Sequence, residues 1–176
     1  MTINVLGGRR WRDEADPAFG RGSNLDGTVS DWVGGVSADF GRKLRLETRA
    51  RFDNDDFGLS RIDAGAKTAL GRLSGSVRYF KLDSDLSSLG TPEEGVAFNA
   101  KVRLTENYFV QLGQTTDLIE QRDLRQSIGI SYEDDCSVFQ IMFTRSETID
   151  RTLGQNDSIM FAFSLKSLGT FGSSDF

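Results

Sequence analysis

Charged side chains, most of them cationic, occupy every second position in residues 43–52, KLRLETRARF. Arg45, Arg49 and Arg51 share one parity with Glu47, and small or apolar residues take most of the other parity. A guanidinium group can bind phosphate through two parallel hydrogen bonds, so a row of arginines on one face suits a phosphorylated ligand. The same row also suits a hydrated wall whose charges pair across strands. Other segments carry similarly placed cations: Arg78, Lys101 and Arg103.

Residue types that build catalytic and metal sites are scarce. The chain has no histidine, which removes Ser-His-Asp chemistry and ordinary zinc sites. The acidic residues show no spacing typical of a catalytic carboxylate pair. Residues 53–56, DNDD, begin like a calcium loop, but Phe57 and Ala64 stand where ligands are needed. We therefore expect no catalytic residue, no cofactor, no metal site and a protein that is not an enzyme.

The alternation that spaces the cations indicates β-strands, because successive side chains of a strand point to opposite faces. No helix is expected. Short turns are expected around 41–42, 70–71, 105–106 and 134–135, and longer loops at 12–27, 84–94, 117–122 and 148–156, with 54–57 the shortest of that set. Tight turns make neighbouring strands antiparallel, so one up-and-down meander should span residues 1–176. About ten strands are expected, at 2–11, 28–40, 43–53, 58–70, 72–83, 95–105, 107–116, 123–133, 136–147 and 157–168.

One face of the expected sheet is apolar, and its aromatic residues indicate the medium that it meets. Two aromatic bands flanking an aliphatic middle are typical of the two water–lipid interfaces of an outer-membrane barrel, although aromatics also favour strand ends in other β proteins. In hydrocarbon such a sheet must close, on itself or with more chain. The prediction is an all-β, antiparallel, up-and-down transmembrane β-barrel. The two bands are Phe40, Tyr108 and Tyr132 near the short turns, and Trp32, Phe52 and Tyr79 near the opposite rim.

Composition excludes two other classes. The formal net charge is −5 and no basic tract is concentrated anywhere, so we expect no nucleic-acid binding. No run of about eighteen apolar residues is present, so no membrane-spanning helix is expected. The start, MTINVLGGRRW, lacks the continuous apolar stretch of a secretory signal. Either the chain is not exported or its first residue is not the natural start of the mature protein.

Three stretches resemble one protein family: residues 30–66, residues 131–151 and residues 158–176. Within them, FDNDDF, YEDDC and SLKSLGTFG are the most specific pieces. From about Trp11 onward the chain resembles the C-terminal barrel region of the lipopolysaccharide-assembly family LptD, also called the organic solvent tolerance family. The resemblance implies a partial chain that supplies the last strands of a larger barrel.

The resemblance also implies a role, a location and partners. It implies transport and assembly of lipopolysaccharide in the cell outer membrane, with lipopolysaccharide, an LptE-like plug lipoprotein and the rest of the LptD chain as partners. Cys136, the only cysteine, matches a family cysteine that forms an interdomain disulfide; the alternative is a buried, inert thiol. A lumen path for lipopolysaccharide would comprise Arg45, Arg49, Arg51, Arg78, Lys101 and Arg103. A lateral-gate strand at 157–168 would carry Ser158, Met160, Ala162, Ser164 and Lys166.

Two other functions fit the residues alone. One is a small self-closed outer-membrane barrel, either porin-like or structural. The other is a soluble ligand-binding barrel with its apolar face turned inward. The soluble barrel would fold in plain buffer, whereas both membrane proteins would aggregate there. The two membrane alternatives differ in whether the isolated chain closes on itself: the small barrel would close, and the partial barrel would not.

Overall fold

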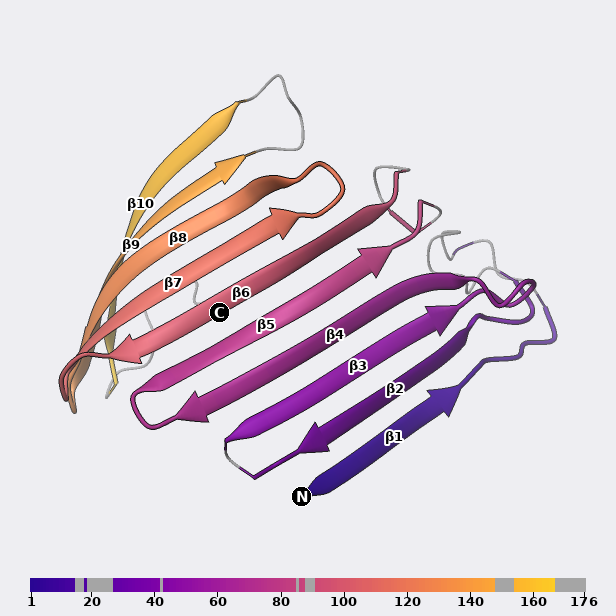
Figure 1. Ribbon diagram of the computed structural model, residues 1–176, viewed down its shortest axis with the longest axis horizontal. Helices are drawn as coiled ribbons and strands as arrows, with labels where there is room; N and C mark the ends of the chain where they lie inside the picture. Colours follow the sequence, from indigo (N-terminus) through magenta and orange to yellow (C-terminus); the bar gives the residue numbers. More distant parts are fainter. Residues whose placement is uncertain are drawn as a thin grey trace.

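The computed structural model describes residues 1–14, 18, 27–41, 43–84, 86–87, 91–147 and 154–166. Within these ranges the chain forms one antiparallel sheet of ten strands (Figure 1). The strands are β1 (Thr2–Gly8), β2 (Trp32–Asp39), β3 (Leu44–Phe52), β4 (Leu59–Leu70), β5 (Leu73–Leu82), β6 (Glu93–Arg103), β7 (Tyr108–Asp117), β8 (Arg122–Glu133), β9 (Ser137–Glu147) and β10 (Gln155–Leu165).

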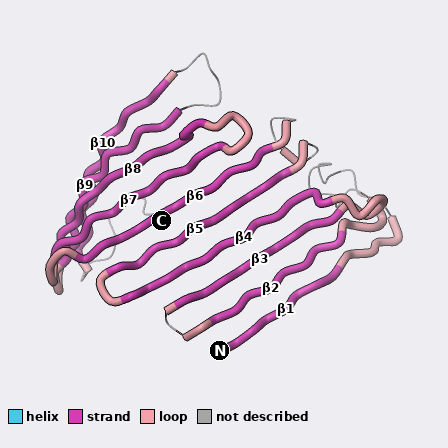
Figure 2. Tube along the Cα trace, viewed as in Figure 1, coloured by secondary structure: helices cyan, strands magenta, loops and turns pink. Residues whose placement is uncertain are grey.

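Each strand pairs with the strand that follows it in the sequence, so the two ends of the sheet have different connections. The turns β2–β3, β4–β5, β6–β7 and β8–β9 lie together at one end, which we call the short-turn end (Figure 2). The β3–β4 and β7–β8 connections lie at the opposite end, the loop end. Gly41 and Gly71 have φ angles of 66° and 59° in two of the short turns. Glycine adopts this left-handed conformation without the steric penalty of a side chain.

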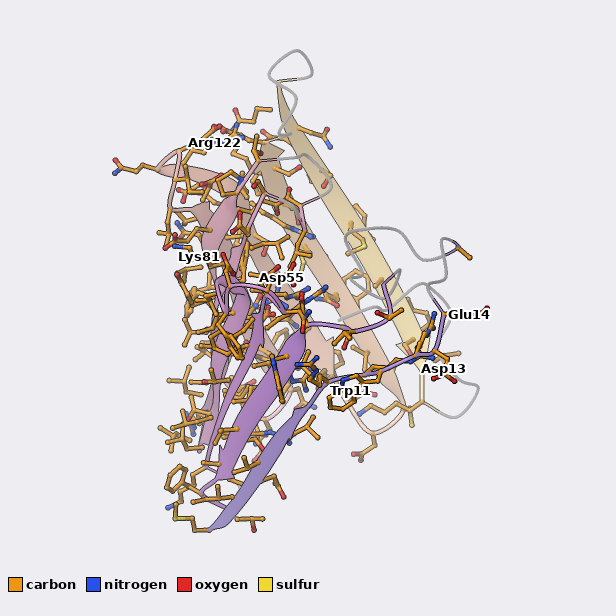
Figure 3. All side chains as sticks on the ribbon, turned by 90° about the vertical axis from the view of Figure 1, so that its right-hand side faces the viewer. Trp11, Asp13, Glu14, Asp55, Lys81 and Arg122 are labelled. Carbon is orange, nitrogen blue, oxygen red and sulfur yellow. The ribbon has the colours of Figure 1, made fainter. Side chains whose placement is uncertain are left out.

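The strand register keeps the two parities on separate faces. Arg45, Glu47 and Arg49 lie opposite Lys67, Gly65 and Asp63, whereas Leu46, Thr48 and Ala50 lie opposite Ala66, Ala64 and Ile62. Figure 3 views the sheet from its β1 edge and shows side chains projecting from both faces. The sheet curls toward the charged face. The buried side chains on its strands indicate this direction, since all of them have the parity of that face: Phe109, Ser131, Gln140, Met142 and Thr144. We call the charged face concave and the apolar face convex.

The convex face carries the aromatic residues at the predicted heights. At the short-turn end, the rings of Tyr108 and Tyr132 meet edge to face, with centroids 5.2 Å apart. At the loop end, Trp32 stacks on Phe57 with centroids 6.3 Å apart. Between the two rims, aliphatic side chains such as Val36, at 49% exposure, face outward. The apolar face is therefore on the outside of the curve, as expected, and the alternative of a soluble barrel with an inward apolar face does not fit the described sheet.

All ten predicted strands are confirmed, with shifts at their ends. β1 ends at Gly8 rather than at residue 11, β2 begins at Trp32 rather than at 28, and the last strand is Gln155–Leu165 rather than 157–168. The register shifts at Arg51/Phe52 and at Thr115/Thr116, where β-bulges bend the sheet. No helix that could span a membrane occurs in the described ranges. β1 and β10 are the two edges of the sheet, so the sheet is open and the predicted closed barrel is not formed by these residues alone.

Candidate functional site

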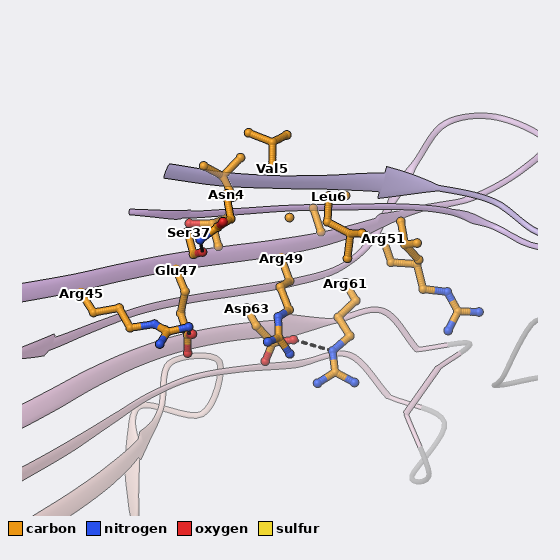
Figure 4. Close-up of a pocket in the computed structure, with 16 residues that line it drawn as sticks. Asn4, Val5, Leu6, Ser37, Arg45, Glu47, Arg49, Arg51, Arg61 and Asp63 are labelled. Carbon is orange, nitrogen blue, oxygen red and sulfur yellow. Dashed lines mark hydrogen bonds and ion pairs between the residues drawn. The ribbon is translucent and has the colours of Figure 1, made fainter. Parts of the chain in front are cut away.

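The predicted arginines of β3 line a hollow of about 700 Å³ on the concave face (Figure 4). Arg45 and Arg49 point to the same side of the sheet as Arg61 and Asp63 of β4. Leu6 of β1 also points toward this side, whereas its neighbour Val5 points away. The hollow therefore combines guanidinium groups with an apolar wall, a composition suited to an amphipathic ligand that bears negative charge.

Several cations of this hollow already have acidic partners. The Arg51 Nε donates a hydrogen bond to Asp31 at 2.6 Å, and Asp31 is only 3% exposed. The backbone N–H of Asn54 donates to the other oxygen of Asp31 at 3.1 Å. Arg61 donates to Asp63 at 2.6 Å. These pairs fix the predicted site residue Arg51 and its neighbour Arg61. They support the alternative of a charge-paired wall for part of the concave face.

Arg49 differs from its neighbours in its surroundings. It lines this hollow and a second one bounded by residues of β3 to β6, which includes Lys67, Arg78 and Asn99. Within the described part of the chain, Arg49 has no hydrogen-bonded or ion-paired carboxylate. Arg45 has only long contacts, 3.7 Å to Asp39 and 3.8 Å to Glu47. Arg49 is thus the predicted site residue best placed to bind an added anion.

Lys101 and Arg103 belong to a separate cluster near the short-turn end. Both lie over the ring of Phe109, at 4.3 Å and 5.4 Å from its centre, and Lys101 also pairs with Glu133. Three of the six predicted cations, Arg45, Arg49 and Arg51, thus line the first hollow. Arg78 lines the second, and Lys101 and Arg103 form a distinct cation–aromatic cluster. Phe109 was missed by the sequence reasoning. Its place on the polar parity of β7, beside Gln111, was the available signal.

Cys136 lies in the short turn between β8 and β9 and its thiol is free and exposed. Its backbone N–H donates to the Asp134 carboxylate at 2.8 Å, and the N–H of Ser137 donates to the same oxygen at 2.6 Å. These two hydrogen bonds, that of Cys136 first, lower the pKa of Asp134 below its ordinary value. The turn presents the thiol to solvent, so the alternative of a buried thiol is wrong for this structure.

The predicted gate residues lie on β10, with one exception. Ser158, Met160, Ala162 and Ser164 share the concave parity of that strand. Lys166 lies one residue beyond β10; its ammonium donates to the carbonyl oxygen of Asp134 at 2.6 Å, and its N–H to that of Cys136 at 2.9 Å. Residues 167 and 168 of the expected strand fall outside the described residues. β9 occupies one edge of β10, and no described strand pairs with the other.

The acidic loop between β3 and β4 uses its carboxylates within the turn. Asp53 accepts hydrogen bonds from the N–H groups of Asp55 and Asp56 at 2.7 Å and 3.3 Å. Asp56 accepts one from the N–H of Gly58 at 2.7 Å. No group of three or more metal-ligating side chains occurs among the residues described. These oxygens thus stabilise the turn itself.

The fold and the charged face define an amphipathic antiparallel sheet, apolar on its convex side and charged on its concave side. Residues 8–108 match the family described as LptD, LPS transport system D. The match covers more than half of the 176 residues, and the chain belongs to this family. No curated protein matches the chain. The resemblance noted from the sequence is confirmed, and with it a general role in lipopolysaccharide transport in an outer-membrane family.

Proposed function

We propose that the chain forms part of the wall of an LptD-type translocon that delivers lipopolysaccharide to the outer leaflet of the outer membrane. Family membership supports the substrate, and the amphipathic sheet supports the location. The convex face would meet lipid and the concave face would line a hydrated lumen. The protein would act by binding and guiding its substrate, without catalysis.

The observation that carries the proposal is the arginine hollow around Arg49. Phosphate groups of a glycolipid accept charge-assisted hydrogen bonds from guanidinium donors. Arg49 and Arg61 line both of the hollows described above, and Arg45 and Arg51 line the first. A phosphorylated sugar would therefore meet a series of cations across β3 and β4.

Closure of the barrel is part of the proposal. An open sheet edge in hydrocarbon leaves backbone groups without hydrogen-bond partners, which costs several kcal/mol for each group. β1 and β10 are both such edges in the described sheet. Further strands of an LptD chain would satisfy them, with β10 as half of a lateral gate and an LptE-like lipoprotein inside the barrel. The small self-closed barrel has less support, because β1 and β10 do not pair.

For Cys136 the proposal is the interdomain disulfide that the family resemblance implies, and the position of the residue is compatible with it. Cys136 is exposed in the β8–β9 turn, and the short-turn end would be the periplasmic side of the barrel. A disulfide to another domain of the LptD chain would form there. The oxidising periplasm favours such a bond.

The test replaces one guanidinium. In cells that make this protein, Arg49→Gln should slow the arrival of newly made lipopolysaccharide at the surface by about fivefold, the factor for the roughly 1 kcal/mol that one typical hydrogen bond contributes. Arrival is measured by pulse labelling and surface modification. Lys81→Gln, which removes a cation from the convex face, is the matched control and should leave the rate unchanged. Equal rates in the Arg49 variant and the wild type would favour the charge-paired wall.

A further inference from the structure

The convex face becomes polar toward the loop end, and its charges there are compensated. On β5 and β6, the Lys81 Nζ lies 3.3 Å from Glu94, and the Tyr79 hydroxyl donates to the same carboxylate at 2.9 Å. On β9 and β10, the Arg145 guanidinium donates to both oxygens of Asp157 at 2.9 Å and 3.0 Å. Between these pairs, Asp123 accepts hydrogen bonds from three side chains: Gln114, Thr116 and Gln126.

Arg9, just after β1, is the exception on this face. Its guanidinium carbon lies 4.7 Å from the centre of the Trp11 ring and 4.9 Å from that of Trp32. Its Nε is buried and has no hydrogen-bond partner in the described part of the chain, and the same is true of the Trp32 indole Nε1. No described carboxylate forms an ion pair with Arg9, in contrast to Lys81 and Arg145.

Two touching side chains thus hold buried donors without acceptors. A buried polar group without a partner is destabilising, and more so when it is charged. Cation–π contacts fix the guanidinium between its neighbours, but they supply no acceptor oxygen. A phosphate monoester or diester offers several acceptor oxygens and negative charge, which is what this pair of donors lacks.

We propose that Arg9, with Trp11 and Trp32, binds the phosphate of a membrane lipid headgroup on the outside of the sheet. This inference rests on the proposed function in one respect, namely that the convex face meets lipid. Trp32 has the outward parity of β2 and stacks on Phe57 at the loop end, the height at which tryptophan favours a membrane interface. The lipid would sit beside the barrel wall, on the opposite face from the arginine hollow.

The chain itself carries the probe for a test. It has only two tryptophans, Trp11 and Trp32, and both belong to the site. The chain is reconstituted in phosphatidylcholine vesicles that contain phosphatidylcholine or phosphatidic acid brominated near the headgroup end of the acyl chains. Bromine quenches tryptophan, so the ratio of the two quenching curves gives the relative affinity of the site for phosphatidic acid. If the isolated sheet does not insert, the same lipids are used in dodecylphosphocholine micelles.

We expect a preference for phosphatidic acid of about fivefold, the contribution of one basic side chain near an anionic membrane surface. Arg9→Gln should abolish this preference. Arg145→Gln, which changes the net charge equally but removes an ion-paired arginine, should retain it. Inorganic phosphate in the buffer should not compete, since the proposed source is the lipid.

Any one of five results would overturn the inference. An unchanged preference in Arg9→Gln would exclude Arg9 as the binding group, and an equal loss in Arg145→Gln would show attraction by net charge alone. Competition by inorganic phosphate would show a site that takes phosphate from water. Absence of quenching by any brominated lipid would contradict the lipid-facing convex surface, and so the proposed function also, whereas quenching without preference would contradict the headgroup site alone.

Discussion

The cations of the concave face differ in their partners more than in their spacing. Arg49 and Arg51 are two residues apart on one strand, yet Arg51 is tied to the buried Asp31 and Arg49 has no ion-paired carboxylate among the described residues. Asp31 lies just before β2, and β3 brings Arg51 to it across the sheet. A period-two pattern indicates the face of a residue, but the partner depends on loops and register. The two alternatives for the arginine row, a binding path and a paired wall, therefore each apply to part of it.

The β8–β9 turn should depend on pH. The pKa of Asp134 is lowered by the N–H groups of Cys136 and Ser137, so its charged form stabilises the folded turn. That stabilisation is present above the ordinary aspartate pKa of about 3.9 and is lost as the pH falls through the lowered value. Hydrogen exchange at the Cys136 and Ser137 amides should show protection that weakens in this acidic window.

Asp134→Asn is the matched variant for the turn. It should expose the same two amides to faster exchange at neutral pH, and it should remove their acid dependence. Asp135→Asn, at the adjacent position, should behave like the wild type. If protection stays constant down to strongly acidic pH, the carboxylate does not hold the turn.

Strands were the most predictable part of this molecule. Residues 43–52 alternate regularly, and only a strand separates alternate side chains onto two faces. The expected strand, 43–53, therefore differs from β3 by one residue at each end. Strand ends at the loop end were harder to predict. β1 stops at Gly8, where the chain leaves the ladder, and Trp11 forms only an isolated bridge with Val29. The bulges and the inward Phe109 also depend on cross-strand neighbours that a single segment does not reveal.

Two adjacent residues of β2 test which face meets lipid. Val36 is 49% exposed on the convex face, and Ser37 lines the arginine hollow beside Glu47. In bilayers, Val36→Arg should lower the free energy of unfolding by about 2–4 kcal/mol, the cost of a cation near the middle of the lipid face. Ser37→Arg, which places the same side chain in the hydrated hollow, is the control.

Urea unfolding from vesicles, followed by tryptophan fluorescence, measures both variants. A small change is expected for Ser37→Arg, because its neighbour Glu47 carries the opposite charge. If the Ser37 variant were the more destabilised of the two, the concave face would be the one in contact with lipid.

At the scale of the whole molecule, the sheet is open although its sequence predicts a barrel. The prediction of closure came from the cost of unpaired backbone in hydrocarbon, and the prediction of strands came from alternation. The alternation of side chains along a strand carries no information about the number of strands in the closed barrel. The number of strands in the complete barrel therefore could not be predicted from these residues, whereas the order and direction of the ten strands could.

Spin labels on the two edge strands measure closure. In a Cys136→Ser background, labels at Val5→Cys of β1 and Phe161→Cys of β10 should lie several strand spacings apart in detergent micelles, where one spacing is about 4.8 Å. Val5→Cys with Val36→Cys, which are direct partners across β1 and β2, calibrates the distance between adjacent strands. A β1–β10 distance as short as that of the calibration pair would mean that the ten strands close on themselves.

Each strand contacts only its neighbours in the sequence. All strand pairings of the sheet are therefore hairpins between consecutive strands. Such hairpins form within about 1–10 microseconds. Strands can be added in chain order, each on the edge left by the one before, so assembly of the sheet has no need of a distant nucleus. A chain ending at Glu133 would lose β9 and β10 yet leave every earlier pairing intact, and the growing edge would simply move to β8.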